Sequence, residues 1–174
     1  MIPRVGDEPP SAEEVAELLD LAVRAPNHHR TEPWRFHVLQ GAERERLARA
    51  IADELVDSKG TDPQAALDEG RAKAERAPVI VVFTVVPSED PRVVEQEEVA
   101  SVAMAIENFL IGAHAKGLGA MLRTGAAAYH PSAREHLGLE PGEKVVGIVY
   151  LGRPAADRAP TERAPAAEKT RWLT

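Results

Sequence analysis

Two short segments concentrate the side chains that could carry chemistry. The first runs from Arg24 to His29, where an arginine, an asparagine and two histidines lie within a few residues. Pro26 and Pro33 restrict this polar stretch, and a loop with so many donors could bind a polar, planar ligand. A helix-ending loop with solvated histidines explains the same residues and stays open as the alternative.

The second segment follows a glycine turn at residues 117–119 and ends in Arg123, Thr124 and Gly125. A strand with this ending could place a cation, a hydroxyl group and bare backbone against the edge of a ligand. A buried strand that ends in a surface arginine and a turn glycine accounts for these residues equally well.

The sequence lacks the residues or motifs that several other common chemistries need. Cysteine is absent, which excludes disulfides, thiol nucleophiles and thiolate zinc sites. The sequence has no Gly-x-Ser-x-Gly motif and no glycine fingerprint between a strand and a helix, so neither a serine hydrolase nor a dinucleotide-binding fold is indicated. The six histidines have no metal-binding spacing; they are His28, His29, His37, His114, His130 and His136.

Charge and hydropathy narrow the possible partners. The net charge is −7 and aromatic residues make up 4% of the chain, so we expect no nucleic-acid partner. No apolar run reaches the roughly 20 residues that a membrane span needs, and the first residues show no apolar leader. Together with the absence of cysteine, these features lead us to expect a cytoplasmic protein without a membrane partner.

Hydrophobic periodicity predicts the elements that would position the two segments. Residues 11–14 have the Ser-x-x-Glu pattern of a capping box, and Pro26 ends the helix that follows near Ala25. Helices and strands then alternate, which predicts an α/β or α+β protein with one sheet. We expect helices at 11–25, 42–57, 64–77, 94–116 and 131–137, and strands at 34–39, 78–86, 120–124 and 144–151.

Three of these stretches carry further expectations. The continuous β-branched run at 78–86 is typical of a strand buried on both faces. The long helix at 94–116 is rich in small residues, so we expect it to be central or packed against a partner. Its predicted inward residues are Val99, Val102, Ala103, Ile106, Leu110 and Ala113. The tail after Gly152 cannot bury much alone, but Trp172 and Leu173 predict that its end docks.

Taken in order, four stretches resemble the nitroreductase family, in particular its compact single-domain branch. They are residues 24–36, 107–119 with the pair Glu107-Asn108, 122–125 and 146–154. The resemblance implies one domain over residues 1–174 with an α+β, three-layer sandwich around a central mixed, mostly antiparallel sheet. It also implies a homodimer that binds FMN at its subunit interfaces, with the tail at 153–174 docking on the partner.

The implied activity is an NAD(P)H-dependent oxidoreductase with ping-pong kinetics. NAD(P)H would deliver hydride to flavin N5 and leave, and a nitro compound, a quinone or a similar small-molecule acceptor would then be reduced. No catalytic side chain and no metal are required, because the flavin carries the reaction. The nicotinamide cofactor would approach near residues 112–117.

By position, the resemblance assigns roles in cofactor binding to seven residues. In this assignment His28 reaches the flavin of the partner subunit, and Arg123 stabilises the negative charge that gathers at flavin N1–C2=O on reduction. Leu122 stands where the family often has a tryptophan. The seven residues are Arg4, Arg24, Asn27, His28, Leu122, Arg123 and Thr124.

The N-terminus departs from the family pattern. Family members usually begin with a helix ending in an Arg-Arg-Ser-x-x-Arg type motif that holds FMN, whereas this sequence starts Met-Ile-Pro-Arg4. Each lost charge-assisted donor costs about 1.5–3 kcal/mol of phosphate binding, although Arg153 or Arg158 could compensate. Two alternatives therefore stay open: a flavin-poor or N-terminally truncated relative that acts as a binding or scaffold protein, and an α/β domain for an unrelated ligand.

Overall fold

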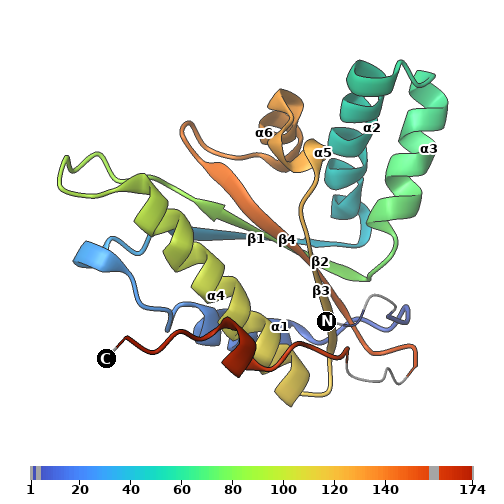
Figure 1. Cartoon of the computed structure of the whole chain (residues 1–174). Coiled ribbons are helices and arrows are strands. Elements are labelled where there is room, and N and C mark those ends of the chain that lie inside the picture. The colour runs from blue at the N-terminus through green and yellow to red at the C-terminus, as the bar shows by residue number, and fades with distance from the viewer. Residues whose placement is uncertain (1, 3–4, 157–160, 174) are drawn as a thin grey trace.

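The computed structural model describes residues 2, 5–156 and 161–173, and it arranges them around one four-stranded sheet (Figure 1). The strand order is β1-β2-β4-β3, and every pairing is antiparallel. The strands are β1 (Trp34–Gln40), β2 (Val79–Val85), β3 (Gly119–Arg123) and β4 (Lys144–Gly152).

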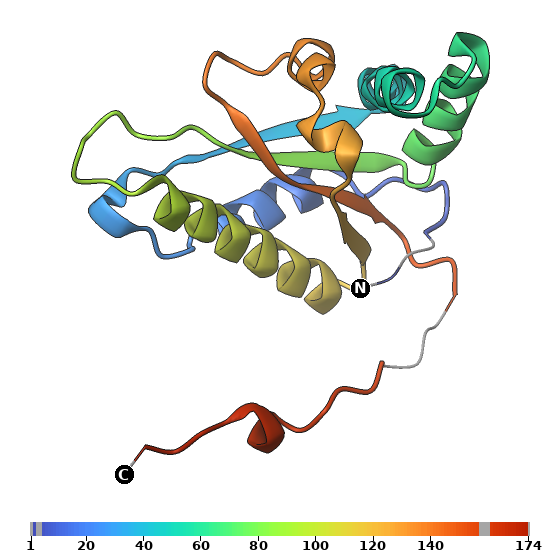
Figure 2. The same ribbon diagram turned by 45° about the horizontal axis from the view of Figure 1, so that its top comes forward.

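Helices cover both faces of this sheet, which confirms the expected three-layer sandwich (Figures 1 and 2). One face packs against α1 (Ala12–Ala22) and α4 (Glu95–Ala115). The opposite face packs against α2 (Glu45–Lys59), α3 (Pro63–Ala74), α5 (Ala126–Tyr129) and α6 (Pro131–Leu137). Short 3-10 turns are η1 (His28–Arg30), η2 (Gly41–Arg44) and η3 (Ala166–Lys169).

The expectation of a mixed sheet is corrected in one respect, because the four described strands contain no parallel pair. A parallel partner would have to come from a further strand along an edge. The described residues 161–173 supply none within the chain, since they are exposed and lie apart from the three layers (Figure 2).

The sequence signals for α1 and β2 are confirmed. The Ser11 hydroxyl accepts from Glu14 N at 3.1 Å, and Glu14 Oε2 accepts from Ser11 N at 2.8 Å, which completes the capping box. All seven residues of β2 are buried, because each face of this central strand has its own hydrophobic core.

Other expectations need correction. The helix expected at 42–57 begins with the η2 turn, α3 ends at Ala74 rather than residue 77, and α5 had no sequence signal strong enough to predict it. Ala103 was expected to face inward, but it lies on the exposed side of α4 in this chain. Trp172 and Leu173 are 87% and 83% exposed in the single chain, and the expected docking of the tail on a partner stays a prediction. Among the described residues, no helix combines the length and apolarity needed to cross a membrane.

A buried carboxylate ties the loop before β4 to the sheet. Glu143 accepts hydrogen bonds from His37 Nε2 at 2.6 Å, from Glu140 N at 2.9 Å and from the Thr84 hydroxyl. Burial by itself would raise the pKa of Glu143, but these donors outweigh burial and hold the pKa below its ordinary value. The carboxylate is therefore satisfied inside the fold and serves structure.

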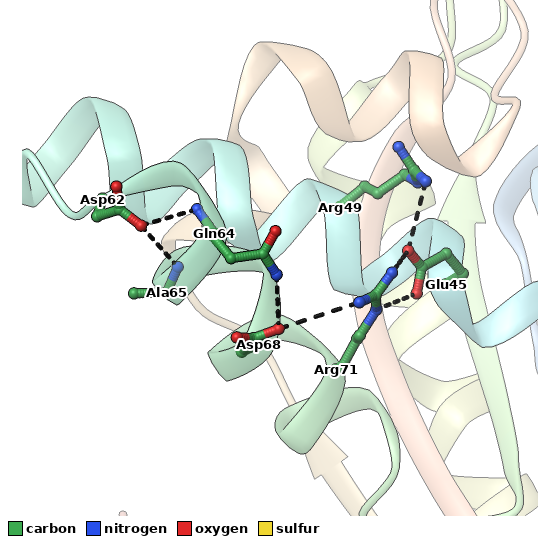
Figure 3. Close-up of polar contacts among 7 residues, drawn as sticks. All are labelled: Glu45, Arg49, Asp62, Gln64, Ala65, Asp68 and Arg71. Carbon is green, nitrogen blue, oxygen red and sulfur yellow. Dashed lines mark hydrogen bonds and ion pairs between the residues drawn. The ribbon is translucent and has the colours of Figure 1, made fainter.

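The helical hairpin α2–α3 has a network of polar contacts on its surface (Figure 3). It also has one close backbone contact. Asp62 caps α3 by accepting from Gln64 N and Ala65 N, both at 3.0 Å, and Arg71 forms two 2.9 Å hydrogen bonds to Glu45. These exposed pairs contribute little stability. The tight packing occurs at buried Gly70, where an added Cβ would overlap the Ala48 carbonyl oxygen.

We predict that Gly70→Ala lowers the free energy of unfolding by about 1–3 kcal/mol, because the methyl group would force the two helix backbones apart. Urea denaturation measures this change. Helix propensity alone predicts the opposite sign, since alanine is the better helix former. The control Ala72→Gly, at an exposed position of the same helix, should cost about 1 kcal/mol or less. A Gly70→Ala protein more stable than the wild type would contradict the packing argument.

Candidate functional site

Side-chain alternation on β3 sends neighbouring candidate residues to opposite faces of the sheet. Arg123 pairs with Ile148 and lies on the α2 side, where it lines a cavity. Leu122 lies on the α4 side in contact with that face's core. An added Cβ on Gly147 would come within 2.7 Å of Leu122 Cδ1 and 2.9 Å of Ile106 Cδ1. Leu122 is thus a packing residue in this chain, and its side chain does not share the cavity.

The cavity beside Arg123 has a volume of about 210 Å³. Its wall joins the end of β3 and the start of α5 to α2, to the end of α3 and to β4. Arg123 and Thr124 both line it, so the structure brings together these two candidate residues. The apolar part of the wall comes from Leu47, Ile51, Ile148, the ring of Tyr150 and the alanines 126–128, and the polar part from Glu54, Lys73, Arg76, Arg123 and Thr124.

Three residues of this wall were missed by the sequence analysis: Lys73, Arg76 and Tyr150. Lys73 is engaged by Glu69 at 2.6 Å. The guanidinium of Arg123 lies over the ring of Tyr150, 5.6 Å from its centroid. Neither Arg76 nor Arg123 forms an ion pair with a carboxylate in the part of the chain that the structure describes. The polar composition of the helix expected at 64–77 was the sequence signal that could have indicated Lys73 and Arg76. It did not show which of its side chains would lie near β3.

Tyr150 forms an uncharged part of the cavity wall. Burial raises the pKa of its phenol above the ordinary value, and the positive charges of Arg123 and Arg76 offset only part of that rise. The phenol is therefore neutral at physiological pH, and both guanidiniums keep their charge available to a ligand. Such a site suits a molecule with an acceptor-rich or anionic edge.

The loop between α1 and β1 is strained and rich in donors. His29, Arg30 and Glu32 have φ values of 58°, 55° and 47°, a region that costs a non-glycine residue about 1–3 kcal/mol. Asn27 Oδ1 accepts from Glu32 N at 3.0 Å and closes the loop. The hydroxyl of Thr31 is buried without a hydrogen-bond partner. A buried hydroxyl left free in a strained loop is what a missing ligand, water or neighbouring chain would explain.

A single chain does not bring this loop to the cavity. The loop leads into β1 at one edge of the sheet, and Arg123 ends β3 at the other edge. The row Arg123–Ile148–Val82–His37 crosses the sheet, a span of roughly 14 Å for three strand spacings. Arg24 and His28 are exposed at their edge. The candidates therefore form two groups, with Arg24, Asn27 and His28 in one and Arg123 and Thr124 in the other.

The remaining candidates divide by position. Arg4 and Arg158 lie outside the described residues. Arg153 donates two hydrogen bonds to the Glu14 carboxylate, at 2.9 and 2.7 Å, so it is engaged by α1 in this chain. The expected nicotinamide approach at residues 112–117 is partly covered, because Gly112 packs under Leu18 and Leu21 of α1.

Comparison with known proteins identifies a matching protein family. The model of the Nitroreductase family matches residues 4–153. YdjA of Escherichia coli (strain K12), whose name assigns it provisionally to the NAD(P)H nitroreductases, is 32% identical over 151 residues, which are 87% of this chain and 81% of YdjA.

Solved structures agree on the fold. A nitroreductase-like family protein from Bacillus cereus superposes with a TM-score of 0.83 at 27% identity, over 99% of this chain and 90% of that one. The FMN and NADPH-dependent nitroreductase NfnB from Sphigopyxis sp. strain HMH gives a TM-score of 0.77 at 19% identity, over 99% and 94%. At that identity the likeness to NfnB concerns the fold alone.

We predict that the buried phenol of Tyr150 ionises above the ordinary tyrosine pKa. In a Tyr129→Phe protein, Tyr150 is the remaining tyrosine, and it should ionise above the ordinary tyrosine pKa of about 10 because it is buried. In the matched Tyr150→Phe protein, this transition above the ordinary tyrosine pKa should be absent. Ultraviolet absorbance during an alkaline titration measures both. A Tyr129→Phe protein that ionises at or below the ordinary tyrosine pKa would show that the Tyr150 phenol is not desolvated.

Proposed function

The chain belongs to the nitroreductase family of oxidoreductase enzymes, and from this premise we propose that it is an FMN-dependent enzyme that takes hydride from NAD(P)H. The electrons would pass to nitro compounds, quinones or similar acceptors by a ping-pong mechanism. The observation that carries the proposal is the cavity at the end of β3. There Thr124 and two guanidiniums, which pair with no carboxylate among the described residues, lie beside apolar side chains.

The described side chains fit an FMN group. Arg123 and Arg76 offer charged donors to the acceptor-rich pyrimidine edge of a flavin, and Thr124 adds a hydroxyl. The fixed charge of Arg123 would favour the reduced, more negative form of the group. When bound, FMN supplies the hydride acceptor and the electron donor of the reaction. The protein side chains then bind and orient it, and none is needed as a nucleophile.

A second copy of the chain would complete this site. The cavity of about 210 Å³ is below the 300–1,000 Å³ typical of ligand pockets, and the donor-rich loop lies at the other edge of the sheet. We place Arg24, Asn27 and His28 of one subunit beside Arg123 and Thr124 of the other. The free Thr31 hydroxyl supports a neighbour at this loop.

Exposed apolar residues support the homodimer. Met104 and Ile111 are exposed and lie seven residues apart on one stripe of α4, and Ile111 is 59% exposed. Trp172 and Leu173 belong to the exposed segment at residues 161–173, which lies apart from the three layers (Figure 2). Docking of the tail on the partner would remove this apolar surface from water.

One observation favours a second function, a flavin-poor relative that acts as a binding or scaffold protein. Arg153 was one of two arginines that could replace the usual phosphate donors, and its guanidinium is occupied by Glu14. Breaking that bidentate pair would cost part of the binding energy gained. The two functions differ in whether the purified protein holds FMN.

We predict that the purified protein binds FMN and that anaerobic NADH or NADPH bleaches the bound flavin. The readouts are the visible absorbance spectrum with and without added FMN, and its change when the nicotinamide is added. An Arg134→Ala protein, altered at an exposed position of α6, serves as the control and should behave like the wild type. A protein that stays colourless and takes up no FMN would rule out the enzyme and leave the scaffold function.

We also predict that Ile111→Glu converts the dimer to monomers and weakens FMN binding at least tenfold, because a buried unpaired carboxylate is costly at an interface. Sedimentation velocity gives the oligomeric state, and flavin fluorescence gives the affinity. The control is Ala65→Glu, at an exposed position in the first turn of α3, which should leave both the dimer and FMN binding unchanged. An Ile111→Glu monomer that binds FMN as tightly as the wild type would refute a site shared between subunits.

A further inference from the structure

Tyr150 lies under the arginine that the proposed function uses. It is 7% exposed, sits on β4 and pairs with Met121 on the edge strand β3. Arg123 is two residues further along β3, so its side chain points to the same face as a diagonal neighbour of the ring. Its guanidinium carbon is 5.6 Å from the ring centroid, within the range of a cation–π contact.

The Tyr150 ring is an aromatic contact of the Arg123 guanidinium. No carboxylate pairs with Arg123 among the residues that the structure describes, and the side chain is only partly buried. A long arginine side chain on an edge strand can adopt many rotamers. The neutral aromatic face restricts those rotamers without cancelling the charge, which an aspartate or glutamate at the same place would do.

We propose that Tyr150 is a positioning residue: its ring holds the Arg123 guanidinium over the cavity, so that the cation is directed at the flavin edge before the flavin binds. The ring also preserves the positive charge of the cavity. Arg76 lines the same cavity, and an uncharged ring neutralises neither Arg76 nor Arg123. The inference rests on the proposed function for its consequence, but the contact itself can be tested in protein without flavin.

The first test uses the flavin-free protein and NMR of the arginine Nε–H groups. Stacking on an aromatic face shifts a proton upfield, so the Arg123 Nε–H signal, assigned by its loss in Arg123→Ala, should be displaced in the wild type. The shift should persist in Tyr150→Phe, which keeps the ring, and disappear in Tyr150→Leu. Tyr129→Leu is the matched control, because Tyr129 is the other tyrosine of the chain and is exposed. An Arg123 signal that is unchanged in Tyr150→Leu would overturn the proposal.

The second test uses FMN as the probe and compares single and double variants. Tyr150→Leu should weaken FMN binding by about tenfold and lower the flavin midpoint potential in the same direction as Arg123→Ala. The Arg123→Ala/Tyr150→Leu double variant should match Arg123→Ala alone, because the ring acts through the arginine. Tyr150→Phe should keep the wild-type potential. Additive effects of the two substitutions would show that Tyr150 acts independently and would overturn the positioning role.

The design separates the two possible failures. If the wild type binds no FMN, the proposed function falls, while the NMR experiment still decides whether Tyr150 orients Arg123. If FMN binds but the potentials are additive, the function stands and the positioning role falls. If Tyr150→Leu does not fold, Tyr150→Met replaces it in both tests, because methionine fills more of the same buried space. The expected and contradicting outcomes are the same.

Discussion

The burial of β2 and β4 on both faces is the constraint from which the rest of the arrangement follows. Because two separate cores press on the same pair of strands, neither strand can shift by one residue without moving apolar side chains to the wrong core. The register of β3 against β4 is fixed in turn. That register sends Leu122 into one core and turns Arg123 toward the cavity, so the position of a charged group is set by the packing of apolar ones.

This dependence explains what could be predicted from the sequence and what could not. The capping box at Ser11, the β-branched run of β2 and the short helix at 131–137 are local signals, and all three were read correctly. The contribution of Arg76 and Tyr150 to the same wall as Arg123 depends on strand order and on the packing of α3, which no local pattern encodes. The family resemblance assigned Leu122 and Arg123 to the same site, yet alternation along a strand sends adjacent side chains to opposite faces.

The same logic divides the candidate residues into two groups. Arg24, Asn27 and His28 precede one edge strand, and Arg123 and Thr124 end the other. The sheet between them is closed by apolar packing and offers no route from one group to the other. The two candidate groups therefore lie at opposite edges of the sheet. A site shared between two copies of the chain is the simplest way for both groups to contact one ligand.

The backbone strain of the loop from His29 to Glu32 has a consequence for selection and for protein engineering. Glycine would adopt the positive φ angles of these residues without strain, so random mutation readily offers more stable versions of this loop. Histidine, arginine and glutamate at these positions therefore carry a conformational cost that glycine would avoid. Variants selected for folding stability alone would be expected to acquire glycine in this loop. Any activity lost in such variants would identify which of these side chains contribute to function.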